Sequence, residues 1–206
     1  MAQDSYIHHL RPAPGPGAAP LVIALHGTGG DEHQFANLAD SLFPGATVLS
    51  PRGDVSEHGA LRFFRRTGEG VYDMADLAAR ADKMTGFLSA WKTELGPRKV
   101  LAFGYSNGAN ILASVAFQRP DLFDAIALLH PLIPFEPASN PALAGLPVLI
   151  TAGRHDPICP APLTSRLETW FTTQGAAVET LWHDGGHELR PSEIEALARF
   201  SREHLT

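Results

Sequence analysis

The sequence predicts a three-layer α/β/α sandwich built on a mostly parallel sheet. Three observations lead to this fold class: short apolar runs alternate with segments of helical periodicity, several runs are apolar on both faces, and glycines and prolines separate them. Parallel strands that are covered by helices on both sides have this continuous apolar character. The length of 206 residues suits one domain, so we expect a single domain over residues 1–206.

The expected strands start with a short one around Tyr6 to Leu10, which a Pro- and Gly-rich linker at 12–17 joins to the rest. Core strands are expected at 21–25, 47–50, 100–103, 125–129, 148–151 and 178–182. Ligands of such sheets bind at the carboxyl ends of the strands. Functional residues should therefore follow these runs.

The expected helices have recognisable start or stop signals. The longest begins at an Asp73 cap, repeats apolar residues at spacings of three and four as far as Leu95, and stops at Gly96-Pro97. Further helices are expected at 34–42, 108–119, 162–174 and 191–204. The segment 130–147 holds five prolines and is too short for a lid, so no cap domain is expected.

Composition excludes several classes of protein. Hydrophobic residues make up 44% of the chain, yet apolar runs such as 21–25 are far shorter than a membrane span, which indicates a soluble globular protein with no membrane-spanning segment. The net charge of −6 and the lack of a basic run argue against nucleic acid as a partner. Cys159 is the only cysteine, and no secretory signal opens the chain, so a cytoplasmic location is the default expectation.

The segment Gly104-Tyr105-Ser106-Asn107-Gly108 matches the pattern G-x-S-x-G. The pattern alone is weak, but here it follows an expected strand and opens an expected helix. In a nucleophile elbow this sharp turn exposes the serine oxygen above the sheet and directs the next backbone N–H at the same reacting atom. The alternative is an ordinary capping serine between two glycines.

A second glycine-rich turn, from His26 to Asp31, follows the first core strand. It is no dinucleotide fingerprint, because Glu32 stands where a glycine is needed. Glycines here could let backbone N–H groups face a developing negative charge, as in an oxyanion hole. A tight turn before a helix is the other interpretation.

The last two strand ends supply an acid and a base. Asp156 follows the strand at 148–151, although an aspartate there can also form only an Asx turn. His187 lies in the turn after the strand at 178–182 and is the expected base, with Asp184 as a second candidate for its partner. His183 and His187 have the spacing of a helical metal pair, but two glycines between them make a helix improbable, so we expect His183 to close the strand.

The order Ser106, Asp156, His187 is that of the α/β-hydrolase triad. On these motifs and on the turns at 25–31, 104–108, 153–160 and 185–187, the chain resembles the α/β-hydrolase esterases, in particular the small phospholipase/carboxylesterase branch that includes acyl-protein thioesterases. The resemblance spans residue 21 to the C-terminus. It implies oxyanion donors at the backbone N–H groups of Thr28 and Asn107.

Some positions depart from relatives of this fold. Thioesterases of the branch usually carry a bulky apolar residue at position 28 and glutamine at position 107, which argues against protein depalmitoylation. A dienelactone hydrolase would have cysteine at position 106, which argues against that chemistry. The segments 51–53, 62–66 and 69–73 are similar to bacterial hydrolases linked to hydroquinone resistance.

The sequence thus predicts a serine carboxylesterase for short- to medium-chain or aromatic esters, with a small-molecule ester as partner and no metal or organic cofactor. A thioesterase or lysophospholipase, and a binding protein of this fold without turnover, are the alternatives. We expect an open site with an apolar wall, although a loop phenylalanine can also be anchored in the core. The wall residues are expected to be Phe63, Phe64, Leu132, Ile133 and Phe135. The oligomeric state stays open, a homodimer included.

Overall fold

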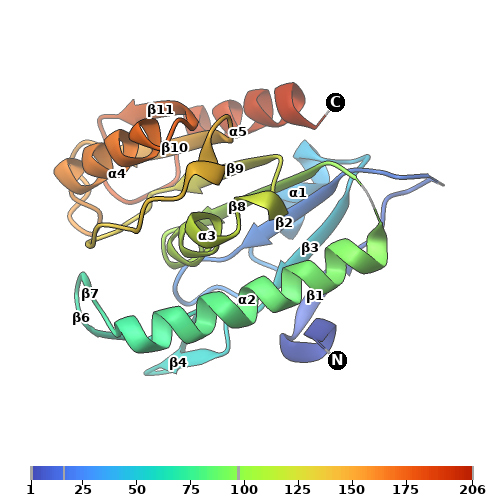
Figure 1. Ribbon diagram of the computed structural model, residues 1–206, viewed down its shortest axis with the longest axis horizontal. Helices are drawn as coiled ribbons and strands as arrows, with labels where there is room; N and C mark the ends of the chain where they lie inside the picture. Colours follow the sequence, from blue (N-terminus) through green and yellow to red (C-terminus); the bar gives the residue numbers. More distant parts are fainter. Residues whose placement is uncertain (1, 16, 97, 206) are drawn as a thin grey trace.

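The computed structural model describes residues 2–15, 17–96 and 98–205, and its centre is a seven-stranded sheet (Figure 1). The strand order is β1-β3-β2-β8-β9-β10-β11. The strands are β1 (His8–Arg11), β2 (Leu21–Leu25), β3 (Thr47–Pro51), β8 (Val100–Tyr105), β9 (Ala125–Leu129), β10 (Pro147–Gly153) and β11 (Ala177–His183). Only β1 runs antiparallel to its neighbour among these, so the predicted mostly parallel sheet is confirmed.

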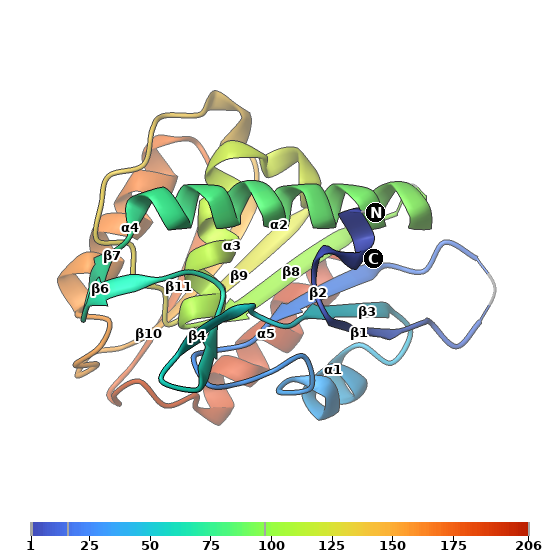
Figure 2. The same ribbon diagram turned by 90° about the horizontal axis from the view of Figure 1, so that it is seen from below.

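Helices cover both faces of the sheet, as Figure 2 shows in a view along the layers. Alternate residues of each strand point to opposite faces, so Ile23 and Ile126 belong to one core cluster while Val22 and Ala127 belong to the other. The first face packs against α2 (Met74–Leu95), α3 (Asn107–Gln118) and α4 (Ala161–Thr173), and the second against α1 (Ala36–Leu42) and α5 (Pro191–His204). The predicted three-layer sandwich is confirmed.

Helix α2 shows how local sequence sets its boundaries. The carboxylate of Asp73 accepts a hydrogen bond from the N–H of Asp76, which satisfies one of the free donors at the start of the helix. Gly96 ends the helix with a φ of +75°, a conformation that glycine adopts without strain. Two residues used in the predictions, Pro97 of this stop signal and Pro16 of the linker, lie outside the described residues.

Two small hairpins lie between β3 and α2, where no element was predicted. They consist of β4 (Val55–Glu57) with β5 (Ala60–Arg62), and β6 (Arg66–Gly68) with β7 (Val71–Tyr72). Three short 3₁₀ helices, η1 (Ala2–Ser5), η2 (Pro120–Leu122) and η3 (Pro141–Leu143), complete the described elements. Between β9 and β10 the described chain forms only η3, so no cap domain lies there.

The topology gathers functional turns at one end of the sheet. The chain goes from β2 to its neighbour β3 and then returns through α2 to β8 on the other side of β2. The connections after β2 and β8 therefore diverge, which makes the crevice between their carboxyl ends the usual ligand site of such sheets. Among the described helices, none has the length and hydropathy needed to cross a membrane.

Candidate active site

The turn between β8 and α3 holds Ser106 in a strained backbone conformation, with φ +54° and ψ −116°. Close backbone packing explains the glycines on both sides of it. A Cβ at Gly104 would lie 2.5 Å from the carbonyl carbon of Gly108, and a Cβ at Gly108 would lie 2.3 Å from the oxygen of Leu25. Side chains at these two positions would therefore push the turn off the sheet, which is the crowding that a nucleophile elbow must avoid.

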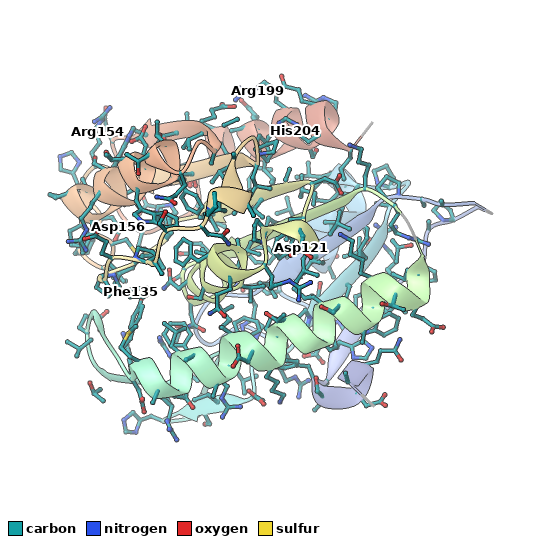
Figure 3. All side chains as sticks on the ribbon, viewed as in Figure 1. Asp121, Phe135, Arg154, Asp156, Arg199 and His204 are labelled. Atoms are coloured by element: carbon teal, nitrogen blue, oxygen red, sulfur yellow. The ribbon has the colours of Figure 1, made fainter. Side chains whose placement is uncertain are left out.

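The structure brings Ser106, His187 and Asp156 into one hydrogen-bonded chain. The Oγ of Ser106 lies 2.9 Å from Nε2 of His187, and Nδ1 of His187 lies 2.7 Å from Oδ2 of Asp156. Both distances suit the proton transfer that activates a serine. Figure 3 shows Asp156 within the loops at the left end of the view, with Arg154 farther out.

Asp156 is held as a carboxylate. Burial opposes its ionisation, but hydrogen bonds from the N–H of Cys159, from His130 and from His187 hold the pKa of Asp156 below its usual value. The N–H of Ile158 also donates to its Oδ1, at 2.8 Å. An ionised acceptor fixes Nδ1 of His187 as a donor, which leaves Nε2 free to accept the serine proton.

The loop after β11 positions His187. The hydroxyl of Tyr105 donates to the carbonyl oxygen of His187 at 2.6 Å, and the two rings lie 5.3 Å apart between centroids. A Cβ at Gly153 would lie 2.1 Å from the oxygen of Gly186, so this loop packs directly on the end of β10. The residue before the nucleophile thus also anchors the base.

Asp184, the second candidate for the acid, points elsewhere. Its side chain is 88% exposed and lies 3.5 Å from the guanidinium of Arg154. His183 is the last residue of β11, as expected, and no helix connects it with His187. The structure therefore places Asp156 rather than Asp184 beside the base.

The two expected oxyanion donors, Thr28 and Asn107, border one cavity with Ser106. Asn107 is the first residue of α3, so its N–H has no acceptor within the helix. Thr28 lies across from it in the turn after β2, and both residues border the same cavity as Ser106 and His187. Two backbone donors must border the same cavity in order to share one oxyanion.

The β4–β5 hairpin fixes the turn that carries Thr28. Nη1 of Arg62 donates to Oγ1 of Thr28 at 2.8 Å, and the N–H of Gly29 donates to the oxygen of Leu61 at 2.9 Å. The side-chain oxygen of Asn107 in turn accepts the N–H of Phe63 at 2.7 Å. Residues 61–63 thus hold the side chains or turns of both expected oxyanion donors.

A cavity of about 330 Å³ opens above Ser106. It is lined by Thr28, Arg62, Arg66, Glu69, Gly70, Tyr72, Tyr105, Ser106, Asn107, Asn110, Leu132, Ile158, Cys159 and His187. Its two guanidinium groups are paired within the hairpins, Arg62 with Glu57 and Arg66 with Glu57 and Glu69. The cavity therefore has both polar and apolar walls, without a large excess of positive charge.

The expected substrate wall is corrected in part. Leu132 borders the cavity, but Phe63 and Phe64 are 0% exposed and belong to the hydrophobic core. Ile133 and Phe135 line a separate hollow of about 230 Å³ beside α4. The error has a physical reason: the segment between the two hairpins turns its phenylalanines into the core, and Arg62 and Arg66 on either side of it border the cavity instead.

Several residues beside the site were missing from the predictions, among them Arg62, Tyr105, His130 and Glu193. One signal could have found His130. His130 directly follows the strand β9 and so lies at the same carboxyl edge as the other site residues. Tyr105 adjoins the nucleophile, but nothing in the local sequence indicates that it contacts His187. Glu193 is the third residue of α5 and locally resembles a simple helix cap.

Comparison with known proteins supports the esterase resemblance. A family model described as the dienelactone hydrolase family matches residues 68–189. The Bacillus subtilis protein named "Putative hydrolase MhqD" is 39% identical over 187 residues, which are 90% of this chain and 94% of that protein.

Two solved structures extend this similarity to nearly the whole chain. The Bacillus cereus carboxylesterase has a TM-score of 0.88 and 35% identity, and the alignment covers 97% of this chain and 94% of that one. The protein Atu2452 of unknown function from Agrobacterium tumefaciens has a TM-score of 0.91 and 53% identity, with 99% of both chains covered.

The fold and these relatives define an α/β-hydrolase of the esterase class. The chain belongs to the dienelactone hydrolase family, because the family model covers more than half of its length. An enzyme that hydrolyses dienelactone is expected to have cysteine as its nucleophile, but this chain has serine at position 106. Family membership therefore does not by itself assign dienelactone as a substrate.

Proposed function

We propose that this protein is a serine carboxylesterase that hydrolyses short- to medium-chain or aromatic carboxylic esters through an acyl-enzyme. The observation that carries the proposal is the chain of hydrogen bonds from Ser106 through His187 to Asp156. This chain ends at a cavity that also contains Thr28 and Asn107. Nucleophile, base, orienting acid and oxyanion donors thus surround one point where an ester carbonyl can bind.

The reaction follows from these positions. Oγ of Ser106 attacks the carbonyl carbon while its proton passes to Nε2 of His187, and the N–H groups of Thr28 and Asn107 stabilise the oxyanion. His187 then gives that proton to the departing alkoxide, which leaves the acyl group on Ser106. In the second half, His187 takes a proton from water, the hydroxide attacks the acyl carbon, and the carboxylic acid departs as Ser106 recovers its proton.

Cys159 borders the same cavity, but its state does not suit a nucleophile. Its side chain is buried, and its Sγ donates to the oxygen of His130 at 3.2 Å. Burial raises the pKa of Cys159 well above the ordinary value of a thiol. Because the thiolate is the reactive form, this cysteine stays unreactive at neutral pH.

The size of the cavity predicts the acyl-chain preference. A volume of about 330 Å³ is near the lower end for ligand pockets, and each buried methylene contributes about 0.8 kcal/mol. We expect kcat/KM for p-nitrophenyl esters to peak at short or medium acyl chains and to fall by the palmitoyl ester, with the Ser106→Ala protein measuring background hydrolysis. A steady rise through sixteen carbons would instead favour a lysophospholipase or a depalmitoylating thioesterase.

The pH dependence tests the role of the base. His187 must be neutral to accept the serine proton, and an ordinary histidine titrates near pH 6.5. Asp156 is already ionised below this range, and burial raises the pKa of Tyr105 to about 12, so it stays protonated. We expect log(kcat/KM) for p-nitrophenyl acetate to rise with a slope of one to a plateau. A flat profile from pH 5 to 8 would contradict general-base catalysis by His187.

A further inference from the structure

Behind Asp156 lies a buried histidine that the proposed reaction does not use. Nδ1 of His130 lies 2.9 Å from Oδ2 of Asp156, the same oxygen that His187 contacts. Nε2 of His130 lies 3.0 Å from Oε1 of Glu193 on helix α5. All three side chains of this Asp156–His130–Glu193 line are inaccessible to solvent.

The two short contacts define the protonation state of His130. Each ring nitrogen faces a carboxylate oxygen, and a nitrogen without a proton would set its lone pair against that oxygen. Burial alone would lower the pKa of His130, but the hydrogen bonds that its ring donates to Glu193 and Asp156 raise the pKa above the ordinary value. The same contacts, together with Thr151, lower the pKa of Glu193 although burial opposes its ionisation. The two contacts and the raised pKa together favour a His130 ring with protons on both nitrogens.

His183 borders this line from the end of β11. Its Nε2 lies 3.2 Å from Oε2 of Glu193 and 3.5 Å from Nε2 of His130. Its Nδ1 accepts the N–H of Gly185 at 3.0 Å, so the proton of a neutral ring sits on Nε2. That proton occupies the atom that a metal would need, so His130, His183 and Glu193 fit a hydrogen-bonded group better than a metal site.

The surroundings hold His130 and Glu193 firmly. His130 adopts φ +52°, a value that is uncommon for residues other than glycine, and its N–H donates to the oxygen of Thr151. The hydroxyl of Thr151 donates to Oε1 of Glu193 at 2.6 Å, and the N–H of Arg190 donates to Oε2 at 2.7 Å. Strained backbone at a buried polar residue persists only where the surroundings impose it, and it is often found at functional sites.

We propose that His130 is a positioning residue of the Ser106 site: doubly protonated between Asp156 and Glu193, it holds Asp156 in place for His187, and its charge opposes premature protonation of His187. The effect on rate rests on the proposed esterase function. The rings of His130 and His187 lie 5.1 Å apart between centroids, within the range where one charge alters the titration of another.

Among the groups that face His130, only Asp156 and Glu193 are expected to be charged besides His130 itself. Besides Asp156 and Glu193, His130 is faced by His183, whose Nδ1 accepts the N–H of Gly185, by the Tyr105 ring and by Cys159. Tyr105 and Cys159 both have raised pKa values and stay uncharged. When His187 takes the serine proton, two imidazolium rings are balanced by two carboxylates. Before that transfer, the cluster keeps a single negative charge, which draws the proton from Ser106.

Two variants should move the acid limb, the part of the pH profile in which kcat/KM rises, toward higher pH. His130→Asn suits the left-handed backbone but removes the positive charge, and Glu193→Gln can donate its amide to Nε2 of His130 so that the ring becomes neutral. We expect the limb to move up by about one pH unit in His130→Asn, which is a tenfold loss of kcat/KM on the acid side, and by less in Glu193→Gln, because that variant also removes the more distant negative charge of Glu193. KM and the plateau at high pH should change much less.

Thr151→Val is the matched control. Valine has nearly the same shape as threonine, but it cannot donate the hydrogen bond that Thr151 gives to Glu193. The substitution removes no charge. We expect it to lower thermal stability and leave the acid limb in place. If all three variants lose stability and none moves the limb, His130 is only structural and the proposal fails.

Nuclear magnetic resonance of the ¹⁵N-histidine-labelled protein tests the charge of His130 without any assay of activity. We expect one ring, assigned by its loss in His130→Asn, to keep both nitrogens protonated from about pH 6 to 8, well above the ordinary histidine value. A ring with one bare nitrogen at pH 7, or a stoichiometric metal in the purified protein, would overturn the proposal. Labelling of Ser106 by a fluorophosphonate separates the esterase proposal from the proposal for His130. A wild-type protein that is not labelled refutes the esterase function. A labelled wild-type protein whose acid limb does not move in either variant refutes the role of His130.

Discussion

Replacing Ser106 with alanine is expected to lower kcat for ester hydrolysis by about 10⁴-fold or more. The reason is that no other hydroxyl lies within hydrogen-bonding distance of Nε2 of His187 among the described residues. Alanine keeps the Cβ that already tolerates φ +54°, so the free energy of unfolding should change little. Steady-state kinetics with p-nitrophenyl acetate, paired with a thermal melt, measures both quantities.

Ser165→Ala provides the control for this variant. Ser165 is exposed on α4, far in sequence from the elbow, and we expect its variant to keep normal turnover. The Ser106 assignment fails if the purified Ser106→Ala protein keeps more than roughly one hundredth of the activity, or if Cys159 becomes acylated in its place.

The second large effect is expected for Asp156→Asn, with kcat reduced by about 10⁴-fold. An amide at this position can present its NH₂ to Nδ1 of His187 and stabilise the wrong tautomer. It also removes the negative charge that the two histidines and two backbone N–H groups surround. Rates at the pH of maximal activity measure this loss.

Asp184→Asn makes the same chemical change three residues before His187. Because the Asp184 side chain is 88% exposed and faces Arg154, we expect its rate to stay within about twofold of the wild type. Should Asp184→Asn be the slower of the two proteins, Asp184 would replace Asp156 as the partner of the base.

The sequence predicted the sheet well, because its strands are buried on both faces and glycines or prolines separate them from the helices. Strand β2 (Leu21–Leu25) and helix α5 (Pro191–His204) begin and end where they were expected. The hairpins β4–β5 and β6–β7 were missed, since their three-residue and two-residue strands are too short for a periodic pattern. Such strands are set by their pairing and by contacts with the elbow.

Residues of the site were predictable where chemistry and local turn coincide, as at Ser106 and His187. Phe63 and Phe64 were misplaced, because an apolar residue in a loop has the same local sequence whether it turns toward substrate or toward the core. His130 and Glu193 meet only through the packing of β9 against α5, and no local pattern indicates such a contact. Predicting them would require the three-dimensional register of the sheet.

The reaction of Ser106 with a fluorophosphonate, mapped by mass spectrometry, tests the central claim most directly. The esterase account predicts a single phosphonyl adduct on Ser106 in the wild-type protein, no adduct in Ser106→Ala, and much slower labelling in Asp156→Asn. A folded wild-type protein that gains no adduct, or that gains it on another residue, would contradict the account.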